Sequence, residues 1–282
     1  MSDNFFSAVS IKKILAQHHI YPKKSLGQNF LINPGVLEKI IQAADLKKED
    51  EVLEIGAGLG TLTVALARKA KKVVAIEKDK QLAQIAAGIF ESENLQNIRL
   101  IQADILKLDI QSLNLAKNYA LVANLPYNIA SRVIQKFLDS EFQPQKMIIM
   151  VQKEVGQRIL ARPPDMNLLA LSVQIFANAQ IADYVKKGSF WPQPKVDSAI
   201  LKIIPKTKKP LKKETKKIFK IARPAFQGKR KTILNTLSKN LSMDKAKTEI
   251  WIKKAGLNPK LRPENLSLKD WIKLVVLRGL AS

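Results

Sequence analysis

Residues 52–60 read Val52-Leu53-Glu54-Ile55-Gly56-Ala57-Gly58-Leu59-Gly60, an apolar run followed by three glycines at alternate positions. The apolar run predicts a buried strand, and Leu62, Ala65 and Leu66 recur at the spacing of a helix. A strand, a glycine turn and a helix form the first unit of a nucleotide-binding α/β fold, in which glycines let a ligand approach the backbone. We therefore expect an α/β fold.

The spacing of the glycines narrows the class of ligand. G-x-G-x-G differs from the G-x-G-x-x-G of dinucleotide-binding folds, and it favours S-adenosylmethionine over NAD. A second apolar run, residues 73–76, ends at Glu77, which lies 21 residues after Gly56. An acidic side chain at about this separation reaches the ribose hydroxyls of a bound nucleoside. A glutamate that only caps the next helix is the alternative.

A third expected strand, residues 98–101, leads to Asp104. The Asp104 carboxylate is placed to accept a hydrogen bond from the adenine amine of a cofactor. An aspartate that caps a local turn is the alternative.

The tetrapeptide Asn124-Leu125-Pro126-Tyr127 follows the apolar run 119–122. It is therefore expected where a buried strand ends and a loop opens at the edge of the sheet. A side-chain amide, a stiff backbone with free carbonyls and a flat aromatic ring suit a planar base that carries an exocyclic amine. An ordinary turn after a strand is the alternative.

Further patterns complete the expected architecture. Asn33-Pro34 predicts the start of a helix that runs to about Ala44, and a second helix is expected from Ser131 to about Leu138. Three more strands are expected, at 147–151, 171–176 and 199–204. We expect an α/β domain over residues 1–204, in which residues 1–20 are a peripheral extension with a short amphipathic helix, and a basic helical domain over 205–282.

The charge of the chain points to a polyanionic partner. The formal net charge is +24, and residues 206–231 contain twelve Lys or Arg and one acid, Glu214. A solvated helix face is the usual explanation of a charged run, but so unbalanced a run favours contact with phosphates. Nucleic acid is the expected partner.

Other functional classes are disfavoured by composition. The chain has no cysteine, which excludes disulfides and thiolate chemistry, and its two histidines, His18 and His19, are adjacent, so we expect no metal site. No apolar run reaches the roughly 18 residues that a membrane span requires, and the N-terminus lacks the apolar core of a signal peptide. We expect a cytoplasmic protein that does not bind membranes.

The stretch 190–198 begins with two aromatic residues, Phe190 and Trp191. Two prolines lie between this pair and Lys195. Prolines stiffen the backbone, so the aromatic rings could form a stacking platform beside a lysine. An edge loop with its aromatic rings buried in the core is the alternative.

Together, the glycine turn, Glu77, Asp104 and the Asn124 tetrapeptide resemble a class I S-adenosylmethionine-dependent methyltransferase that acts on an adenine N6. Two further stretches resemble signatures of the ribosomal RNA adenine dimethyltransferase family; they read Ser25-Leu26-Gly27-Gln28-Asn29-Phe30-Leu31 and Phe190-Trp191-Pro192-x-Pro194-x-Val196-x-Ser198. The Leu-Gly step before Gln28, residues 222–232 and the stretch 262–267 are similar to the branch that dimethylates two adjacent adenines near the 3′ end of small-subunit rRNA. The resemblance covers about residues 21–280.

This resemblance implies a Rossmann-like, seven-stranded, mostly parallel sheet with a small C-terminal all-α domain. It implies S-adenosyl-L-methionine as cofactor and small-subunit (16S) rRNA in the 30S subunit as partner, and we expect a monomer with a role in small-subunit biogenesis. The cofactor site implied is Asn29, Leu31, Gly56, Gly58, Glu77, Asp104 and Asn124. The residues implied to hold the target base are Asn124, Leu125, Pro126, Tyr127 and, by stacking, Phe190.

Three other functions stay open. A resistance methyltransferase would modify one adenine of large-subunit rRNA, and the stretch 25–27 and the helical tail argue against it. A non-catalytic assembly factor would bind the small subunit without methylating it, which the intact glycine turn and Asn124 disfavour. A DNA adenine methyltransferase usually opens its motif with Asp-Pro-Pro, which this chain lacks.

Overall fold

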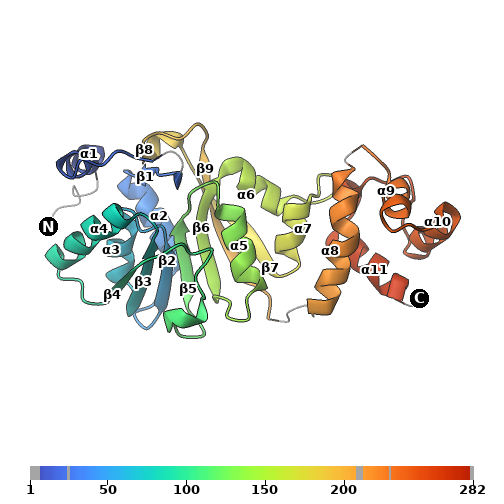
Figure 1. Ribbon diagram of the computed structural model, residues 1–282, viewed down its shortest axis with the longest axis horizontal. Coiled ribbons are helices and arrows are strands. Elements are labelled where there is room, and N and C mark those ends of the chain that lie inside the picture. The colour runs from blue at the N-terminus through green and yellow to red at the C-terminus, as the bar shows by residue number, and fades with distance from the viewer. Residues whose placement is uncertain (1–6, 24–25, 208–211, 229, 280–282) are drawn as a thin grey trace. The chain divides into compact units, whose positions relative to one another are not determined.

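The computed structural model describes residues 7–23, 26–207, 212–228 and 230–279, and the chain divides into two compact units (Figure 1). Unit 1 contains residues 1–156 and 179–205, and unit 2 contains residues 157–178 and 206–282. The division after residue 205 agrees with the expected boundary. Residues 157–178, which the sequence had assigned to the first domain, belong instead to the helical unit.

Unit 1 is organised around a seven-stranded sheet in the order β4-β3-β2-β5-β6-β9-β7 (Figure 1). The strands are β2 (Glu51–Ile55), β3 (Lys72–Glu77), β4 (Ile98–Gln102), β5 (Ala120–Asn124), β6 (Lys146–Gln152), β7 (Ala177–Val185) and β9 (Ser198–Pro205). The pairs that join β4, β3, β2, β5 and β6 are parallel, and β9 pairs with β6 antiparallel. The expected seven-stranded, mostly parallel sheet is confirmed.

The central strands are mostly apolar because helices cover both faces of a parallel sheet. Val52 and Leu53 of β2 and Leu121 and Val122 of β5 are all fully buried. The chain moves outward from β2 through β3 to β4 and then returns to place β5 on the other side of β2. The carboxyl ends of β2 and β5 therefore meet at the point where the strand order reverses, which is where such sheets bind ligands.

Helices α2 and α4 of unit 1 begin after residues whose side chains cap them. Asn33 accepts a hydrogen bond from the Val36 amide at the start of α2, and Asp79 caps α4 through the amides of Gln81 and Leu82. The helices assigned wholly or largely to this unit are α1 (Ala8–Gln17), α2 (Pro34–Ala44), α3 (Thr61–Ala67), α4 (Lys80–Ser92) and α5 (Ala130–Asp139). The helices expected at about 34–44 and 131–138 are confirmed, and the short amphipathic helix expected within residues 1–20 is α1.

A two-stranded antiparallel ribbon joins distant parts of unit 1. It pairs β1 (Phe30–Leu31) with β8 (Phe190–Trp191), so that Leu31 lies opposite Phe190. The ribbon brings together the two stretches that resembled family signatures, although Ser25 at the start of the first lies outside the described residues.

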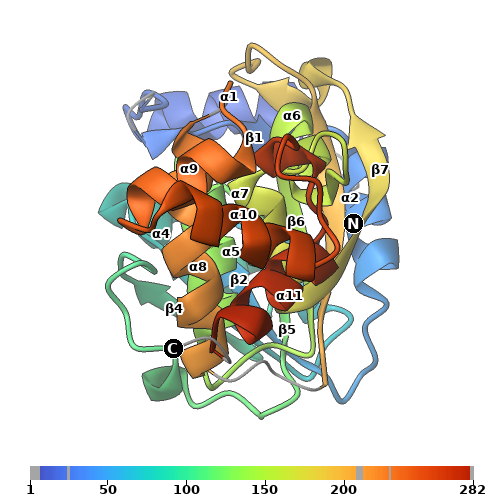
Figure 2. The same cartoon turned by 90° about the vertical axis from the view of Figure 1, so that its right-hand side faces the viewer.

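Unit 2 is helical. It holds α7 (Leu168–Gln174), α8 (Lys212–Gln227), α9 (Ile233–Asn240), α10 (Lys245–Lys254) and α11 (Leu268–Gly279), and α6 (Lys153–Leu160) ends within it. α8 contacts α7, α9 and α11 (Figure 2). The core of this unit includes Trp271, which is fully buried, and Ile218 and Ile221 of α8.

The strand expected at 171–176 is wrong, because this stretch is the end of α7 and the start of the turn that follows it. Asn167 caps the helix by accepting from the Ala170 amide at 3.0 Å. Leu171 and Ile175, four residues apart, pack in the same apolar cluster as α8, which is why this stretch joins unit 2. A short apolar run fits a strand and a buried helix equally well.

The basic stretch 206–231 contains α8, whose two faces differ; residues 208–211 and 229 lie outside the described part of the chain. Lys213, Lys216, Lys217 and Lys220 are exposed, whereas Ile221 on the opposite face is buried. The segment is thus an amphipathic helix with a cationic outer face. None of the described helices combines the length and the apolar character needed to cross a membrane.

Candidate active site

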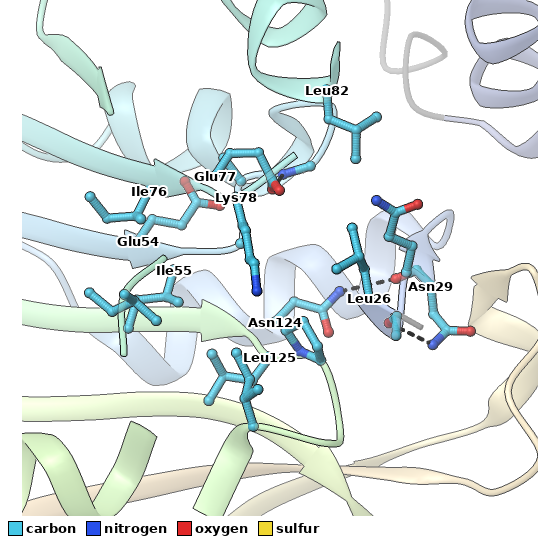
Figure 3. A pocket seen from close by; sticks show the side chains of 18 of the residues that line it. Leu26, Asn29, Glu54, Ile55, Ile76, Glu77, Lys78, Leu82, Asn124 and Leu125 are labelled. Carbon is cyan, nitrogen blue, oxygen red and sulfur yellow. Dashed lines mark hydrogen bonds between the residues drawn. The ribbon is translucent and has the colours of Figure 1, made fainter. Parts of the chain in front are cut away.

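A cavity of about 370 Å³ opens at the carboxyl edge of the sheet in unit 1 (Figure 3). Its walls come from the turns after β2, β3, β4 and β5 and from residues 26–31, called here the wall segment. Ten of the eleven site residues expected from the sequence line it: Asn29, Leu31, Gly56, Gly58, Glu77, Asp104, Asn124, Leu125, Pro126 and Tyr127. The topological switch between β2 and β5 therefore assembles almost the whole expected site.

The glycine turn needs its glycines for geometry. Gly60 has φ +86°, and a Cβ built on it would lie 2.4 Å from Cε1 of the buried Phe90 ring. Gly58 has φ +59°, and its amide donates to the Glu77 carboxylate at 2.8 Å. A side chain at either position would be strained by the positive φ, and one at Gly60 would also clash with Phe90 of α4.

The Glu77 carboxylate is held at the end of β3. One oxygen accepts from the Gly58 amide and the other from the Asp79 amide, both at 2.8 Å. Burial raises the pKa of Glu77 above its ordinary value, and these backbone donors oppose the rise. Because Asp79 caps α4, Glu77 is not the capping residue, and its remaining lone pairs can accept from a vicinal diol in the cavity.

The Asp104 carboxylate combines the two roles considered from the sequence. It accepts from the Leu106 amide at 3.0 Å, as a turn cap does, and it also lines the cavity, with Lys78 Nζ 3.1 Å from its other oxygen. The Leu106 amide, followed by Lys78, lowers the pKa of Asp104 despite partial burial. The carboxylate is therefore ionised and can accept a hydrogen bond.

The Asn124 side chain is oriented by the wall segment. Its Nδ2 donates to the Asn29 main-chain carbonyl at 3.4 Å, while the Asn29 amide group donates to the Gly27 carbonyl at 3.1 Å (Figure 3). With its nitrogen engaged in this way, Asn124 has its Oδ1 available as an acceptor. A primary amine in the cavity is a matching donor.

The residues after Asn124 complete this wall. Leu125 is 2% exposed, and the Tyr127 hydroxyl lies 2.9 Å from Ser198 Oγ at the start of β9. Burial raises the pKa of Tyr127, against the effect of the Ser198 hydrogen bond, so the phenol is neutral at physiological pH. The ring is thus fixed at one end and presents a flat apolar surface.

Phe190 is the one expected residue that does not line the cavity. It pairs with Leu31 in the β1–β8 ribbon, and its side chain is 3% exposed within the main apolar cluster of unit 1. This arrangement agrees with the alternative of an aromatic ring buried in the core. A stacking role for Phe190 would require the ring to leave this cluster, and it stays a prediction.

Glu54 was not predicted as a site residue, yet it lines the cavity from the middle of β2. The side chain is 1% exposed, and neither carboxylate oxygen has a hydrogen-bond partner among the described residues. Burial raises the pKa of Glu54 to about 8; the Thr63 side chain opposes this rise and the charge of Glu77 adds to it. Its signal in the sequence is an acid inside an otherwise apolar run, since such a residue is costly without a partner.

Asp79 is a second residue that the sequence did not single out. Its side chain is 3% exposed, and Oδ2 accepts from Lys23 Nζ at 2.7 Å and from Gln28 Nε2 at 3.3 Å. Gln28 in turn accepts from the Lys23 amide at 2.7 Å. Asp79 therefore anchors the wall segment to the start of α4, close to the residues that hold Glu77.

The arrangement suits a cationic nucleoside and a separate planar base. Glu77 and Asp104 supply acceptors for ribose and adenine groups. The buried Glu54 carboxyl is mostly protonated at neutral pH, and a cation of the ligand beside it would favour its ionised form. Within the described ranges, no cluster of three or more His, Asp or Glu side chains could hold a metal ion. These acceptor groups fit S-adenosylmethionine, which carries ribose hydroxyls, an adenine amine and a positive charge.

Comparison with known proteins agrees with this geometry. A family model described as ribosomal RNA adenine dimethylase matches residues 21–277. A relative from Dehalococcoides mccartyi, named ribosomal RNA small subunit methyltransferase A, is 42% identical over 93% of this chain and 90% of its own length. A relative of the same name from Geobacillus thermodenitrificans is 38% identical over 93% of each chain.

Two solved structures are similar along most of the chain. A dimethyladenosine transferase from Plasmodium falciparum has a TM-score of 0.76 and 31% identity, covering 89% of this chain and 97% of its own. The 23S rRNA methyltransferase ErmE has a TM-score of 0.70 and 23% identity, covering 88% of this chain and 99% of its own. It shows a likeness of fold alone. The expected methyltransferase fold with a helical C-terminal region is confirmed.

Proposed function

The chain belongs to the ribosomal RNA adenine dimethylase family, and from this membership we propose that it dimethylates the N6 of two adjacent adenines near the 3′ end of small-subunit rRNA. The relatives named small subunit methyltransferase A support the choice of subunit. The observation in this chain that carries the proposal is the Asn124 amide, whose oxygen is left free at the cavity by the hydrogen bond to Asn29.

The methyl donor is S-adenosylmethionine, which supplies an electrophilic methyl group on a sulfonium when it is bound. Glu77 would accept from its ribose hydroxyls and Asp104 from its adenine amine, and its positive charge would favour ionisation of the buried Glu54 carboxyl. The turn at Gly56 and Gly58 allows backbone approach, and Asn29 and Leu31 close the wall beside it. These assignments explain why three acidic residues line a cavity in so basic a chain.

Asn124 and Leu125 prepare the target amine. An adenine N6 is a poor nucleophile because its lone pair is delocalised into the ring. The Asn124 Oδ1 and the Leu125 carbonyl each accept a hydrogen bond from one of the two N6 hydrogens. These hydrogen bonds favour a pyramidal nitrogen and direct its lone pair toward the reacting methyl carbon. No strong base is then required, because the proton leaves to water once the nitrogen carries the new methyl group.

Tyr127 supports the base by stacking. Its hydroxyl is held by Ser198, so the ring is ordered before the base arrives and loses little freedom on binding. Stacking on an aromatic ring contributes about 1–3 kcal/mol per base, which offsets part of the cost of extruding the base from RNA. Pro126 keeps the backbone of this wall stiff.

The second methyl transfer uses the same residues differently. Monomethyladenine has one N6 hydrogen, so only one of the two acceptor contacts survives. Stacking on Tyr127 and the fit of the methyl group then contribute more to positioning the base.

We propose that the chain acts as a monomer on the 30S subunit in the cytoplasm, with the cationic face of α8 on rRNA phosphates.

The test is methyl transfer from isotopically labelled S-adenosylmethionine to unmethylated small subunits and, in parallel, to large-subunit rRNA. The products are identified as nucleosides by mass spectrometry. Dimethyladenosine on the small subunit alone is expected. Label on the large subunit alone would move the assignment to a resistance methyltransferase, and tight binding to the small subunit without label would favour an assembly factor.

A further inference from the structure

A second, open groove adjoins the active-site cavity in unit 1. It has a volume of about 640 Å³ and lies between the loop after β4 and helix α5. Leu106 and Arg132 line both the groove and the cavity, so the two spaces share a wall. Its volume falls in the range of ligand sites, roughly 300–1,000 Å³. This space is called here the flanking groove.

The flanking groove has a fixed frame. Lys136 Nζ donates to the Leu106 carbonyl at 3.3 Å and also to the Leu108 carbonyl, which ties the loop to α5. The Asp109 carboxylate accepts from the Gln111 amide at 3.2 Å and holds the turn at the end of the loop. Both charged side chains are thus engaged in building the groove.

Among the residues described, three other polar side chains of the groove make no contact that builds its frame. Arg132 is exposed, and its guanidinium makes no hydrogen bond or ion pair with the residues that the structure describes. The exposed side-chain amides of Gln111 and Gln135 likewise have no partner within the described ranges. A cation therefore stands at the boundary with the cavity, and two amides stand in the groove itself.

We propose that the flanking groove binds the nucleotide next to the target adenine in the same RNA strand, and that Arg132 binds the phosphate between the two nucleotides. This inference rests on the proposed function. A strand whose base enters the cavity must bring its neighbouring phosphate past the shared wall, where Arg132 lies. A guanidinium binds phosphate oxygens in bidentate fashion.

The chemistry of the groove favours a base over further phosphates. Asp109 and Asp139 line it and would repel a second phosphate. Glutamine amides hydrogen-bond to base edges, as in the recognition of unstacked RNA bases, and Leu106 and Leu108 offer an apolar surface to a base. Because the target lies beside a second adenine, the occupant is that second adenine while one of the two adenines is being methylated.

The test compares Arg132→Gln and Arg132→Lys with the wild type on unmethylated small subunits over a series of salt concentrations. Arg132→Gln is expected to raise KM for the subunit about tenfold, which is typical of a lost charge-assisted contact, with kcat and the KM for S-adenosylmethionine unchanged. The slope of log KM against log salt should fall by roughly 0.7, the value for one phosphate of a single strand. Arg132→Lys should restore the slope but only part of the affinity.

Lys48→Gln is the matched control, because Lys48 is exposed and precedes β2, at the opposite edge of the sheet. An equal change of slope in Lys48→Gln would overturn the inference by showing a general effect of charge. If the wild type methylates small subunits and Arg132→Gln retains its KM and slope, the groove assignment is wrong while the proposed function stands. If the wild type methylates neither subunit, the proposed function itself fails.

Discussion

The Asn124 side chain donates to the main-chain carbonyl of Asn29 across 3.4 Å, joining two residues that are 95 positions apart. Asn29 belongs to the wall segment, which Asp79 anchors from the other side through Gln28. The orientation of the amide at the end of β5 thus depends on a loop held by the start of α4. This arrangement and the groups around it lead to five predictions.

Replacing Asn124 by Ala removes an acceptor that is used as the amine reacts. We expect kcat to fall by about a hundredfold or more, by analogy with the loss of one preorganised polar group, and the dissociation constant for S-adenosylmethionine to change far less. Single-turnover methylation of small subunits and equilibrium dialysis of the cofactor measure the two quantities. Equal losses in both would contradict the role given to Asn124.

Replacing Asn124 by Asp separates two roles of the side chain: accepting a hydrogen bond from the target amine, and being oriented by its own hydrogen bond to Asn29. The carboxylate keeps an acceptor but cannot donate to the Asn29 carbonyl, and two oxygens would then face each other. We expect this variant to lose most of the activity that Asn124→Ala loses. Wild-type turnover in Asn124→Asp would show that the Asn29 contact does not orient the side chain.

Glu54 should make the stability of the cofactor-free protein depend on pH. Its pKa is about 8 in the folded state, above its ordinary value of 4.5, so between these two pH values the folded state binds more protons than the unfolded state. The free energy of unfolding should therefore fall as the pH rises from about 5 to 8, by up to a few kcal/mol. Glu54→Gln should lack this decline when unfolding is followed in urea at each pH, and parallel curves for the two proteins would refute the prediction.

Lys23 should support cofactor binding through Asp79. Although burial alone would raise it, the pKa of Asp79 is lowered by Lys23 and by the Leu82 and Gln81 amides, so the carboxylate stays charged. Lys23→Met leaves this buried charge with fewer donors and loosens the wall segment, and we expect the KM for S-adenosylmethionine to rise about five- to tenfold. Lys69→Met, at an exposed lysine beyond α3, is the control and should behave as the wild type.

Two glycines give a matched pair for stability. Gly60→Ala would force a Cβ to within 2.4 Å of the Phe90 ring at φ +86°, and should lower the free energy of unfolding by about 2–4 kcal/mol. Gly88→Ala, at an exposed position of α4 with no atom within 4 Å of the new Cβ, should raise it by roughly 0.5–1 kcal/mol. Urea midpoints measure both, and a neutral Gly60→Ala would show that the turn tolerates a side chain.

Much of unit 1 could be predicted because its elements carry local signals. β2, β3, β5 and β6 are buried on both faces and read as apolar runs, and α2 begins at an asparagine and a proline that favour a first turn. The Asn124 tetrapeptide and Glu77 each stand at the end of such a strand. Because parallel strands end at one edge of a sheet, their meeting in one cavity followed from the order of the elements.

The errors and omissions have a common physical cause. The run at 171–176 was assigned to a strand because its apolar residues fit either period, and only packing against α8 made it helical. Phe190 does not line the cavity, because β8 pairs with β1 and places its ring in the core, so its stacking role stays a prediction. In both cases the deciding partner lies far away in the chain.

By itself, the sequence determined the fold class, the glycine turn at Gly56 and the loop at Asn124 to which we assign the reaction, since each depends on neighbouring residues. Only the tertiary structure decided the orientation of Asn124 by Asn29, the isolation of Glu54 and the anchoring of the wall segment by Asp79. These features are set by burial and by contacts between distant segments. Burial and such contacts arise when the chain folds, and no local pattern of residues encodes them.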